Sequence, residues 1–148
     1  MKKIISIAIV FNILTIRAYS QQKLDQSAVP ATVKTSFSSM YPHSQVEYWV
    51  KEEGNYAAEF DSEKKEMVLI LRPDGKVVKL ETRIHPSGLP AAAKDYIAKH
   101  YPGKKVTDCV TTSDPEGHRI YEAEVNERDL IFDSNGNFIK SVKERPVD

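Results

Sequence analysis

The side chains of this sequence that could do chemistry are one cysteine, four histidines and scattered carboxylates. Cys109 is the only cysteine, so no internal disulfide can form. Its thiol has two interpretations: a reactive or bridging group, or a small buried hydrophobe flanked by Val106 and Val110. No histidine or asparagine motif points at Cys109, which favours the buried hydrophobe.

The histidines and acids are not spaced like those of a metal centre or a hydrolase. Zinc sites need several convergent ligands, whereas the histidines are expected in loops, at a helix end and at a strand start. Asp61-Ser62-Glu63 lacks the spaced oxygens and the glycine of a calcium loop, which favours a solvated turn. Glu59 and Glu124 could supply the two carboxylates of a hydrolase, but they occupy corresponding positions of a repeated unit, which favours a structural role. The histidines are His43, His85, His100 and His118.

Sequence motifs of known enzyme classes are also absent. The chain has no G-x-S-x-G, no H-E-x-x-H, no phosphate-binding glycine loop and no C-x-x-C. We therefore predict a protein that is not an enzyme, with no catalytic residue, no metal ligand and no cofactor.

Three apolar residues are the candidates for binding a partner: Trp49, Ile70 and Ile131. Side chains alternate between the two faces of a strand, so if Tyr48 and Val50 face the core, Trp49 faces away from it. Ile70 and Ile131 likewise alternate with residues assigned to the core. Large apolar side chains on an uncovered sheet face are typical of protein contact surfaces. Two alternatives stay open: another part of the chain covers these residues, or a slip of register places Trp49 in the core.

The elements that would position these residues belong to a unit that occurs twice in the sequence. Residues 27–50 align with residues 87–110, and residues 69–79 align with residues 130–140. The changes of offset between these blocks fall in polar stretches, where insertions are tolerated in surface turns. A tandem repeat therefore organises the chain.

Each copy is predicted to contain one helix and four strands. Pro30 and Pro90 suit the first turn of a helix, and Tyr41-Pro42 and Tyr101-Pro102 end the two helices. Apolar residues spaced by three or four give each helix one apolar stripe. The predicted strands are Gln45–Lys51, Asn55–Asp61, Glu66–Arg72 and Lys76–Ile84, then Lys105–Thr112, His118–Asn126, Arg128–Asp133 and Asn137–Glu144.

Tight turns such as Asp74-Gly75 and Asn135-Gly136 require the strands that they join to run antiparallel. The predicted fold is therefore α+β, with two tandem α-β4 repeats and an antiparallel sheet covered by helices on one face. A unit of about sixty residues is near the lower limit of independent stability, so we expect the two sheets to join edge to edge. The register of the last strand in each copy stays open.

The first twenty residues are typical of a secretory signal peptide. Lys2 and Lys3 precede an apolar run, and Ala18-Tyr19-Ser20 provides small residues for cleavage after Ser20. The alternative is an uncleaved membrane anchor, although the run is short for a membrane span. The predicted division is residues 1–20 as signal peptide, 21–86 as the first repeat and 87–148 as the second.

Charge limits the partners. Cleavage removes Lys2, Lys3 and Arg17 from a chain with equal numbers of acids and bases, so the mature protein is mildly acidic. Such a surface does not attract nucleic acid or anionic lipid. We expect a periplasmic or secreted protein with no nucleic-acid partner and no stable membrane insertion after signal cleavage.

Short motifs recur in the same order in both copies. In the first copy they are Val29-Pro30, Tyr41-Pro42, Tyr56-Ala57-Ala58-Glu59-Phe60 and Arg72-Pro73-Asp74-Gly75; in the second they are Leu89-Pro90, Tyr101-Pro102, Tyr121-Glu122-Ala123-Glu124-Val125 and Asp133-Ser134-Asn135-Gly136. This pattern, over about residues 28–145, resembles the PepSY-like family of exported bacterial proteins, related in fold to beta-lactamase-inhibitor protein. The resemblance implies an extracytoplasmic protein with helices on one face of a curved sheet, and it implies no catalytic residue. Some relatives inhibit hydrolases or occur in peptidase propeptides, so inhibition is an analogy only.

The function expected from the sequence is that of a binding module for a protein or peptide of the cell envelope. Inhibition of a hydrolase is the form of binding that the resemblance implies. A sensor of envelope ligands or stress, and a metal-dependent hydrolase, remain as alternatives.

Overall fold

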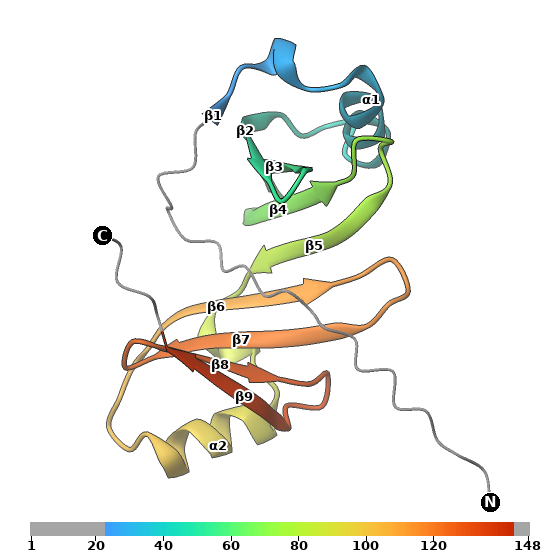
Figure 1. Cartoon of the computed structure of the whole chain (residues 1–148). Coiled ribbons are helices and arrows are strands. Elements are labelled where there is room, and N and C mark those ends of the chain that lie inside the picture. The colour runs from blue at the N-terminus through green and yellow to red at the C-terminus, as the bar shows by residue number, and fades with distance from the viewer. Residues whose placement is uncertain (1–22, 144–148) are drawn as a thin grey trace, which may run out of the picture.

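The computed structural model describes residues 23–143, which form two helices, two short 3-10 turns and nine strands (Figure 1). The helices are α1 (Ala31–Met40) and α2 (Ala91–His100), and the 3-10 turns η1 (Gln26–Ala28) and η2 (Pro86–Gly88) precede them. The strands are β1 (Lys23–Leu24), β2 (Val46–Glu52), β3 (Asn55–Ser62), β4 (Lys65–Leu71), β5 (Val77–Arg83), β6 (Val106–Ser113), β7 (Arg119–Val125), β8 (Arg128–Phe132) and β9 (Phe138–Lys143). The predicted α+β class with an antiparallel sheet is confirmed.

The nine strands form a single sheet in which spatial order follows chain order. A helix followed by four strands occurs in each half of the chain. The halves meet where β5 pairs with β6, with Leu80 opposite Ser113 and Arg83 opposite Val110. The expected edge-to-edge joining of the two sheets is therefore confirmed. Among the strands of residues 23–143, this junction leaves β1 and β9 as the edges of the sheet.

Both helices begin and end at the residues that the prolines indicate. Pro30 and Pro90 occupy the N-cap positions, where the missing N–H of proline costs nothing. At the other end, the N–H groups of Tyr41 and Tyr101 donate to helix carbonyls at 2.8 Å. Each helix is about three turns long and would be marginal alone, so packing on the sheet must stabilise it.

The register places both helices on the same face of the sheet. In the first half, the buried cluster beneath α1 includes Val33, Phe37 and Leu69. In the second half, Ala93 and Ile97 of α2 belong to a cluster with strand residues of β6, β7 and β8. The predicted helix-covered residues of the middle strands are confirmed in both clusters: Tyr56, Ala58, Phe60, Leu69, Leu71, Tyr121, Ala123, Val125, Leu130 and Phe132.

A register shift in β2 determines which way Trp49 faces. The pairing of β2 with β3 shifts by one residue between Val46 and Tyr48, as happens at a β-bulge. The strict alternation expected along this strand is broken there, so Trp49 faces the helices and Val50 faces away. The prediction that Trp49 lies on the uncovered face is therefore wrong.

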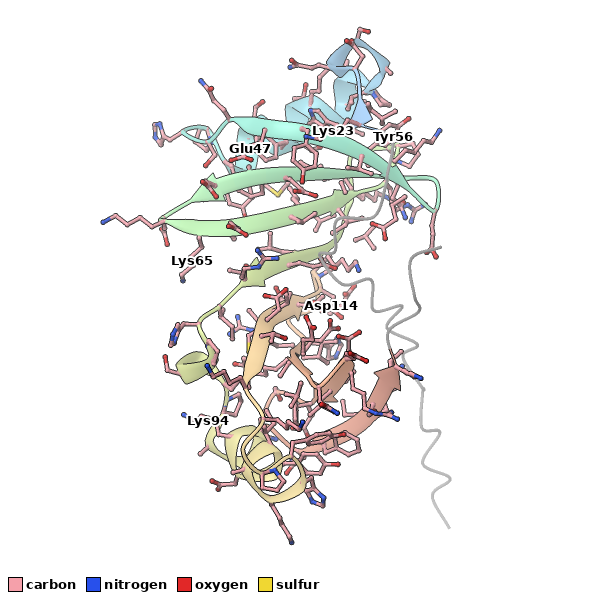
Figure 2. The ribbon with its side chains drawn as sticks, turned by 90° about the vertical axis from the view of Figure 1, so that its left-hand side faces the viewer. Lys23, Glu47, Tyr56, Lys65, Lys94 and Asp114 are labelled. Carbon is pink, nitrogen blue, oxygen red and sulfur yellow. The ribbon has the colours of Figure 1, made fainter. Side chains whose placement is uncertain are left out.

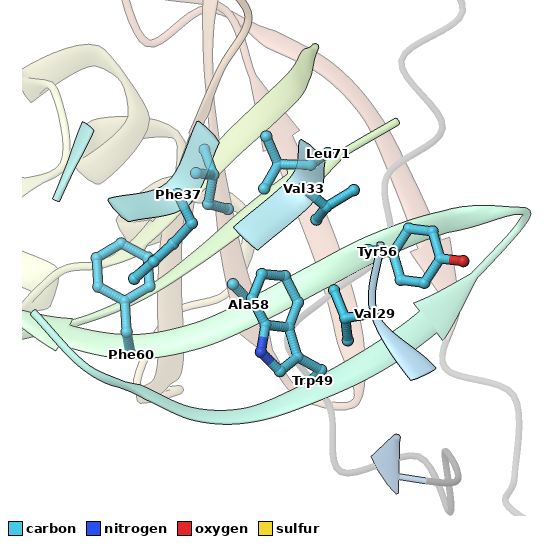
Figure 3. Packing of buried hydrophobic residues seen from close by; sticks show 9 residues of the cluster. Val29, Val33, Phe37, Trp49, Tyr56, Ala58, Phe60 and Leu71 are labelled. Atoms are coloured by element: carbon cyan, nitrogen blue, oxygen red, sulfur yellow. The ribbon is translucent and has the colours of Figure 1, made fainter. Parts of the chain in front are cut away.

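The indole of Trp49 is part of the core beneath α1. The residue is 4% exposed, and its ring centroid lies 6.0 Å from that of Phe37 in an edge-to-face arrangement. Figure 3 shows Trp49 packed beside Ala58 and Val29. The pairing of β6 with β7 shifts in the same way between Val106 and Asp108, so the strict alternation of faces is broken there as well.

Shifts of register also determine which side chains of the last strand in each half face the helices. β5 shifts opposite Ile70/Leu71, so that Val77 and Leu80 pack toward α1 while Val78 packs on the opposite face. β9 shifts at the corresponding place, and Phe138 stacks on Tyr96 of α2 with ring centroids 4.4 Å apart. The side of these strands that the sequence left open is thus set by bulges.

The predicted signal peptide, residues 1–20, lies outside the described residues. Within residues 23–143, no helix is long and apolar enough to cross a membrane.

Candidate partner-binding face

The face of the sheet turned away from the helices, called here the outer face, carries a compact apolar cluster in the first half. Val50, Ala57, Val68 and Ile70 form its floor, with exposed fractions between 3% and 7%. Tyr48 and Val78 are half-buried and pack against these residues, so they reach farther toward solvent. The cluster therefore presents apolar surface mainly through Tyr48 and Val78.

Charged side chains surround this cluster and continue over the second half. Directly opposite residues of an antiparallel pair share a face, so the register identifies the outer-face members. The acids are Glu52, Glu59, Asp61, Glu66, Glu81, Asp108, Glu122, Glu124 and Asp129, and the bases are Lys23, Lys79, Arg83 and Lys140. Acids outnumber bases among these residues, so the outer face is acidic.

A buried ion pair lies next to the apolar cluster on β5. The ammonium nitrogen of Lys79 lies 2.7 Å from a carboxylate oxygen of Glu81, and these side chains are 11% and 5% exposed. Burial raises the pKa of Glu81, while the charge and hydrogen bond of Lys79 act in the opposite direction. Burial also raises the pKa of the nearby Glu52. Glu81 and Glu52 are thus harder to ionise than free carboxylates.

Tyr48 forms a second polar group at the edge of the cluster. Burial, and then its hydrogen bond to Glu59, raise the pKa of Tyr48 to about 12. The ammonium of Lys23 lies 3.8 Å from the centre of the Tyr48 ring, a cation–π contact. Tyr48 therefore stays neutral near pH 7 and offers an aromatic surface with a polar end.

Arg83 connects the two halves on this face. Its guanidinium forms ion pairs with Glu66 of β4 and with Asp108 of β6, the latter with Nε 3.1 Å from Oδ1. Asp108 lies beside the β-bulge of β6. The contact spans the β5–β6 junction, so the outer face is continuous from one half to the other.

The three candidate residues from the sequence are not brought together. Trp49 belongs to the core on the opposite face. Ile70 and Ile131 are on the outer face but are only 3% and 1% exposed. Tyr48 and Val78 were missed because the bulges of β2 and β5 reverse their predicted sides.

Cys109 is buried in the cluster beneath α2. Burial, together with the negative charges of Asp108 and Glu122, raises the pKa of its thiol to about 12. A thiol that stays protonated is a poor nucleophile. The interpretation of Cys109 as a small buried hydrophobe is confirmed.

The turn between β6 and β7 gathers three potential ligand groups that the sequence reasoning missed. One atom each of Asp114, Glu116 and His118 lies within 4.8 Å of the others. Asp114 directly follows Ser113, which pairs with Leu80 of β5, so it lies at the end of β6 next to the first half (Figure 2). It accepts hydrogen bonds from the backbone N–H of His118 at 2.9 Å and from its ring nitrogen Nδ1 at 2.8 Å. Although burial would raise the pKa of Asp114, these bonds hold it below its usual range, so the group stabilises the turn. Its signal in the sequence is the spacing Asp-x-Glu-x-His.

An open depression of about 530 Å³ lies beside α2. Its described lining comes from η2, the helix and the segment after it, including Leu89, Lys94, Ile97, Tyr101 and Lys104. No histidine, carboxylate or thiol lies among these lining residues.

A family model described as "Putative beta-lactamase-inhibitor-like, PepSY-like" matches this chain twice, over residues 16–79 and 72–140. No curated protein matches the chain.

Solved structures from three Bacteroides species have the same fold. A protein from Bacteroides eggerthii, described among "putative periplasmic proteins", is 20% identical with TM-score 0.72, over 77% of this chain and 88% of its own. A DUF2874 family protein from Bacteroides uniformis is 22% identical with TM-score 0.70, over 76% and 88%. A BLIP-like protein from Bacteroides fragilis is 18% identical with TM-score 0.65, over 80% and 89%. At these identities the likeness shows the fold alone. Because the family model covers most of the sequence, the chain belongs to the PepSY-like, beta-lactamase-inhibitor-like family.

Proposed function

We propose that the protein is a non-enzymatic binding module whose outer face takes an extended segment or loop of another protein. The observation that carries this proposal is the outer face itself, which has an apolar cluster in the first half surrounded by ionisable side chains and continues across the β5–β6 junction into the second half. An apolar centre with a polar rim is the usual anatomy of a protein interface. Tyr48 and Val78 are the side chains best placed to meet the partner, with Ile70 beneath them.

We infer that the two halves, residues 21–86 and 87–148, are copies of one α-β4 unit, and this duplication supports the assignment. Lys23 pairs with Val50 in the first half, and Arg83 pairs with Val110 at the corresponding positions of the second. Duplication of a small unit produces a sheet wide enough to offer an interface. Ile131 occupies the position of Ile70 in the second copy and forms part of the same face.

Export to the periplasm or the outside of the cell is part of the same proposal. The amino-terminal sequence is typical of a cleaved signal, and similar structures are described as periplasmic proteins. A partner would then be another protein or peptide of the cell envelope. Inhibition of a hydrolase is the narrower form that the family description favours.

The test compares capture by two variants of the mature protein, Val78→Arg and Thr35→Arg. Val78→Arg puts a long cation in the middle of the outer face, whereas Thr35 is exposed on α1 and serves as the matched control. Immobilised wild type should capture a protein from the periplasmic extract of its own bacterium, identified by mass spectrometry. We expect that protein to be lost with Val78→Arg and kept with Thr35→Arg. Equal capture by both variants would remove the outer face from the site.

The inhibitor form has a separate test, because capture alone does not show inhibition. The captured protein is assayed for hydrolysis with increasing amounts of the wild type and of Val78→Arg. Inhibition by the wild type alone supports the narrower function. Hydrolysis unchanged by a saturating amount of wild type would leave a binding module without inhibitory action.

A further inference from the structure

β9 is an edge strand with an unusual concentration of exposed apolar side chains. Four large hydrophobic residues are exposed among the described residues, and three of them are on β9: Phe138 at 37%, Ile139 at 52% and Val142 at 43%. Within the described part of the chain, β9 pairs with β8 on one side only. An exposed edge carrying apolar residues is a template for pairing with another strand.

The first half contains a strand that corresponds to β9 and already has a partner on its second edge. β5 follows a tight turn, pairs with β4 and shifts register where Ile70 and Leu71 face Lys79 and Val77. β9 follows the corresponding turn and shifts where Ile131 and Phe132 face Lys140 and Phe138. The far edge of β5 is paired with the antiparallel strand β6 along Leu80–Arg83. The far edge of β9 has the same strand geometry, and no strand of residues 23–143 pairs with it.

Charge indicates what sequence would pair there. Lys140 and Lys143 are exposed on β9, and Arg128, opposite Lys143 on β8, reaches Ser141 with Nη1 3.2 Å from Oγ. The nearest carboxylate on β8, Asp129, is buried at 7% exposure. The edge is thus basic at the surface. At the β5–β6 junction, a base on the edge strand pairs with an acid on the added strand, Arg83 with Asp108.

We propose that the free edge of β9 binds an extended segment of a partner protein that carries both apolar and acidic residues, as an added antiparallel strand. Main-chain hydrogen bonds would supply affinity, apolar residues would cover Ile139 and Val142, and acids would meet the two lysines. A second copy of this chain fits less well, because pairing two β9 strands gathers four lysines in one strand pair. The proposal does not require that the outer face bind anything.

The test uses two short capped peptides and the folded mature protein. The first peptide carries glutamates opposite Lys143 and Lys140, valines opposite Val142 and Ile139, and a threonine opposite Ser141. The second peptide has lysines in place of the glutamates. The glutamate peptide should slow backbone hydrogen exchange in β9 and bind more weakly as salt rises, whereas the lysine peptide should do neither. Absence of protection in β9 with the glutamate peptide would overturn the proposal.

Reversing the charges on β9 tests whether the two lysines select the acidic peptide. Lys140→Glu/Lys143→Glu should weaken binding of the glutamate peptide by about tenfold and allow the lysine peptide to bind, since the two cross-strand charge pairs change from attractive to repulsive for the first peptide and from repulsive to attractive for the second. The matched control is Lys99→Glu/Lys104→Glu at exposed positions of α2 and the following loop, which should leave the preference unchanged. Lys140→Gln/Lys143→Gln should give an intermediate result and guards against a folding defect. Equal effects of both reversals, or protection of β9 without peptide together with a doubled mass at high concentration, would contradict the proposal.

Discussion

The only tryptophan of the chain, Trp49, is a core residue, and its removal has a calculable consequence. Its ring contacts Phe37 edge to face and is 4% exposed. Trp49→Ala should lower the free energy of unfolding by about 3–5 kcal/mol, because it leaves a cavity beneath α1. Urea unfolding followed by circular dichroism measures this change.

The control for this prediction is Met40→Ala. Met40 is 42% exposed at the end of α1, and its truncation should change stability by less than about 0.5 kcal/mol. A loss for Trp49→Ala no larger than that of Met40→Ala would show that the indole is not packed in the core.

The ion pair of Lys79 and Glu81 predicts a pH-dependent loss of stability. Lys79→Met leaves the buried carboxylate of Glu81 unpaired, so its pKa, already raised by burial, rises further. An acid whose pKa is raised on folding contributes most stability below its unfolded pKa and loses that contribution as pH rises. The variant should therefore be close to wild type near pH ~4.5 and about 3 kcal/mol less stable at pH ~8. Urea titrations at the two pH values test this.

A double replacement separates charge from packing at this pair. Lys79→Met/Glu81→Met removes both charges and should recover most of the stability, with little dependence on pH. If the single Lys79→Met variant lost the same amount at both pH values, desolvation of Glu81 would not be the cause.

At the scale of elements, the turns between the last two strands of each half are pressed against the helices. A Cβ on Gly136 would lie 2.7 Å from Pro90 Cβ and 2.9 Å from the backbone nitrogen of Ala93. Gly136 also has φ of +86°, which disfavours any other residue. The turn thus fixes the distance between the β8–β9 hairpin and the start of α2.

Gly136→Ala and Gly54→Ala separate the cost of the positive φ from the cost of the steric clash. Gly54 has a similar φ of +83°, but a Cβ added there would meet no atom within 4 Å. Gly54→Ala should therefore cost only about 1 kcal/mol of backbone strain. Gly136→Ala adds the clash with backbone and should cost roughly 3 kcal/mol. Thermal unfolding of the two variants measures the difference, and equal losses would mean that the hairpin is not in contact with α2.

The elements were predictable from the sequence because prolines, glycines and alternation act locally. The predicted strand Asn55–Asp61 differs from β3 by one residue at its end, and the other seven predicted strands match their counterparts to within one residue at each end. The short strand β1 was not predicted. The sides of Trp49 and Val78 were not predictable, because a β-bulge adds a residue to one strand without any required residue type. The sequence therefore placed Ile70 and Ile131 on the correct face. It wrongly placed Trp49 on that face and missed Tyr48 and Val78, which lie there.

At the scale of the whole molecule, each half is too small to be very stable alone, and the β5–β6 junction joins them into one sheet. Arg83 adds ion pairs to Glu66 of the first half and Asp108 of the second. Since Arg83 is 39% exposed, these pairs contribute little beside the shared backbone pairing. We therefore expect the sheet, and not the charges, to couple the folding of the two halves.

The two halves carry separate natural probes for this coupling. Trp49 fluorescence reports the core under α1, and the thiol of Cys109, buried with a pKa raised to about 12, reports the core under α2. The thiol should resist alkylation at pH ~8 in the native protein and react once its half unfolds. In urea, the loss of tryptophan burial and the gain of thiol reactivity should share one midpoint, because unfolding either half exposes its edge of the junction. Two midpoints would show that each half holds its own fold, and the sheet would then be two sheets in contact.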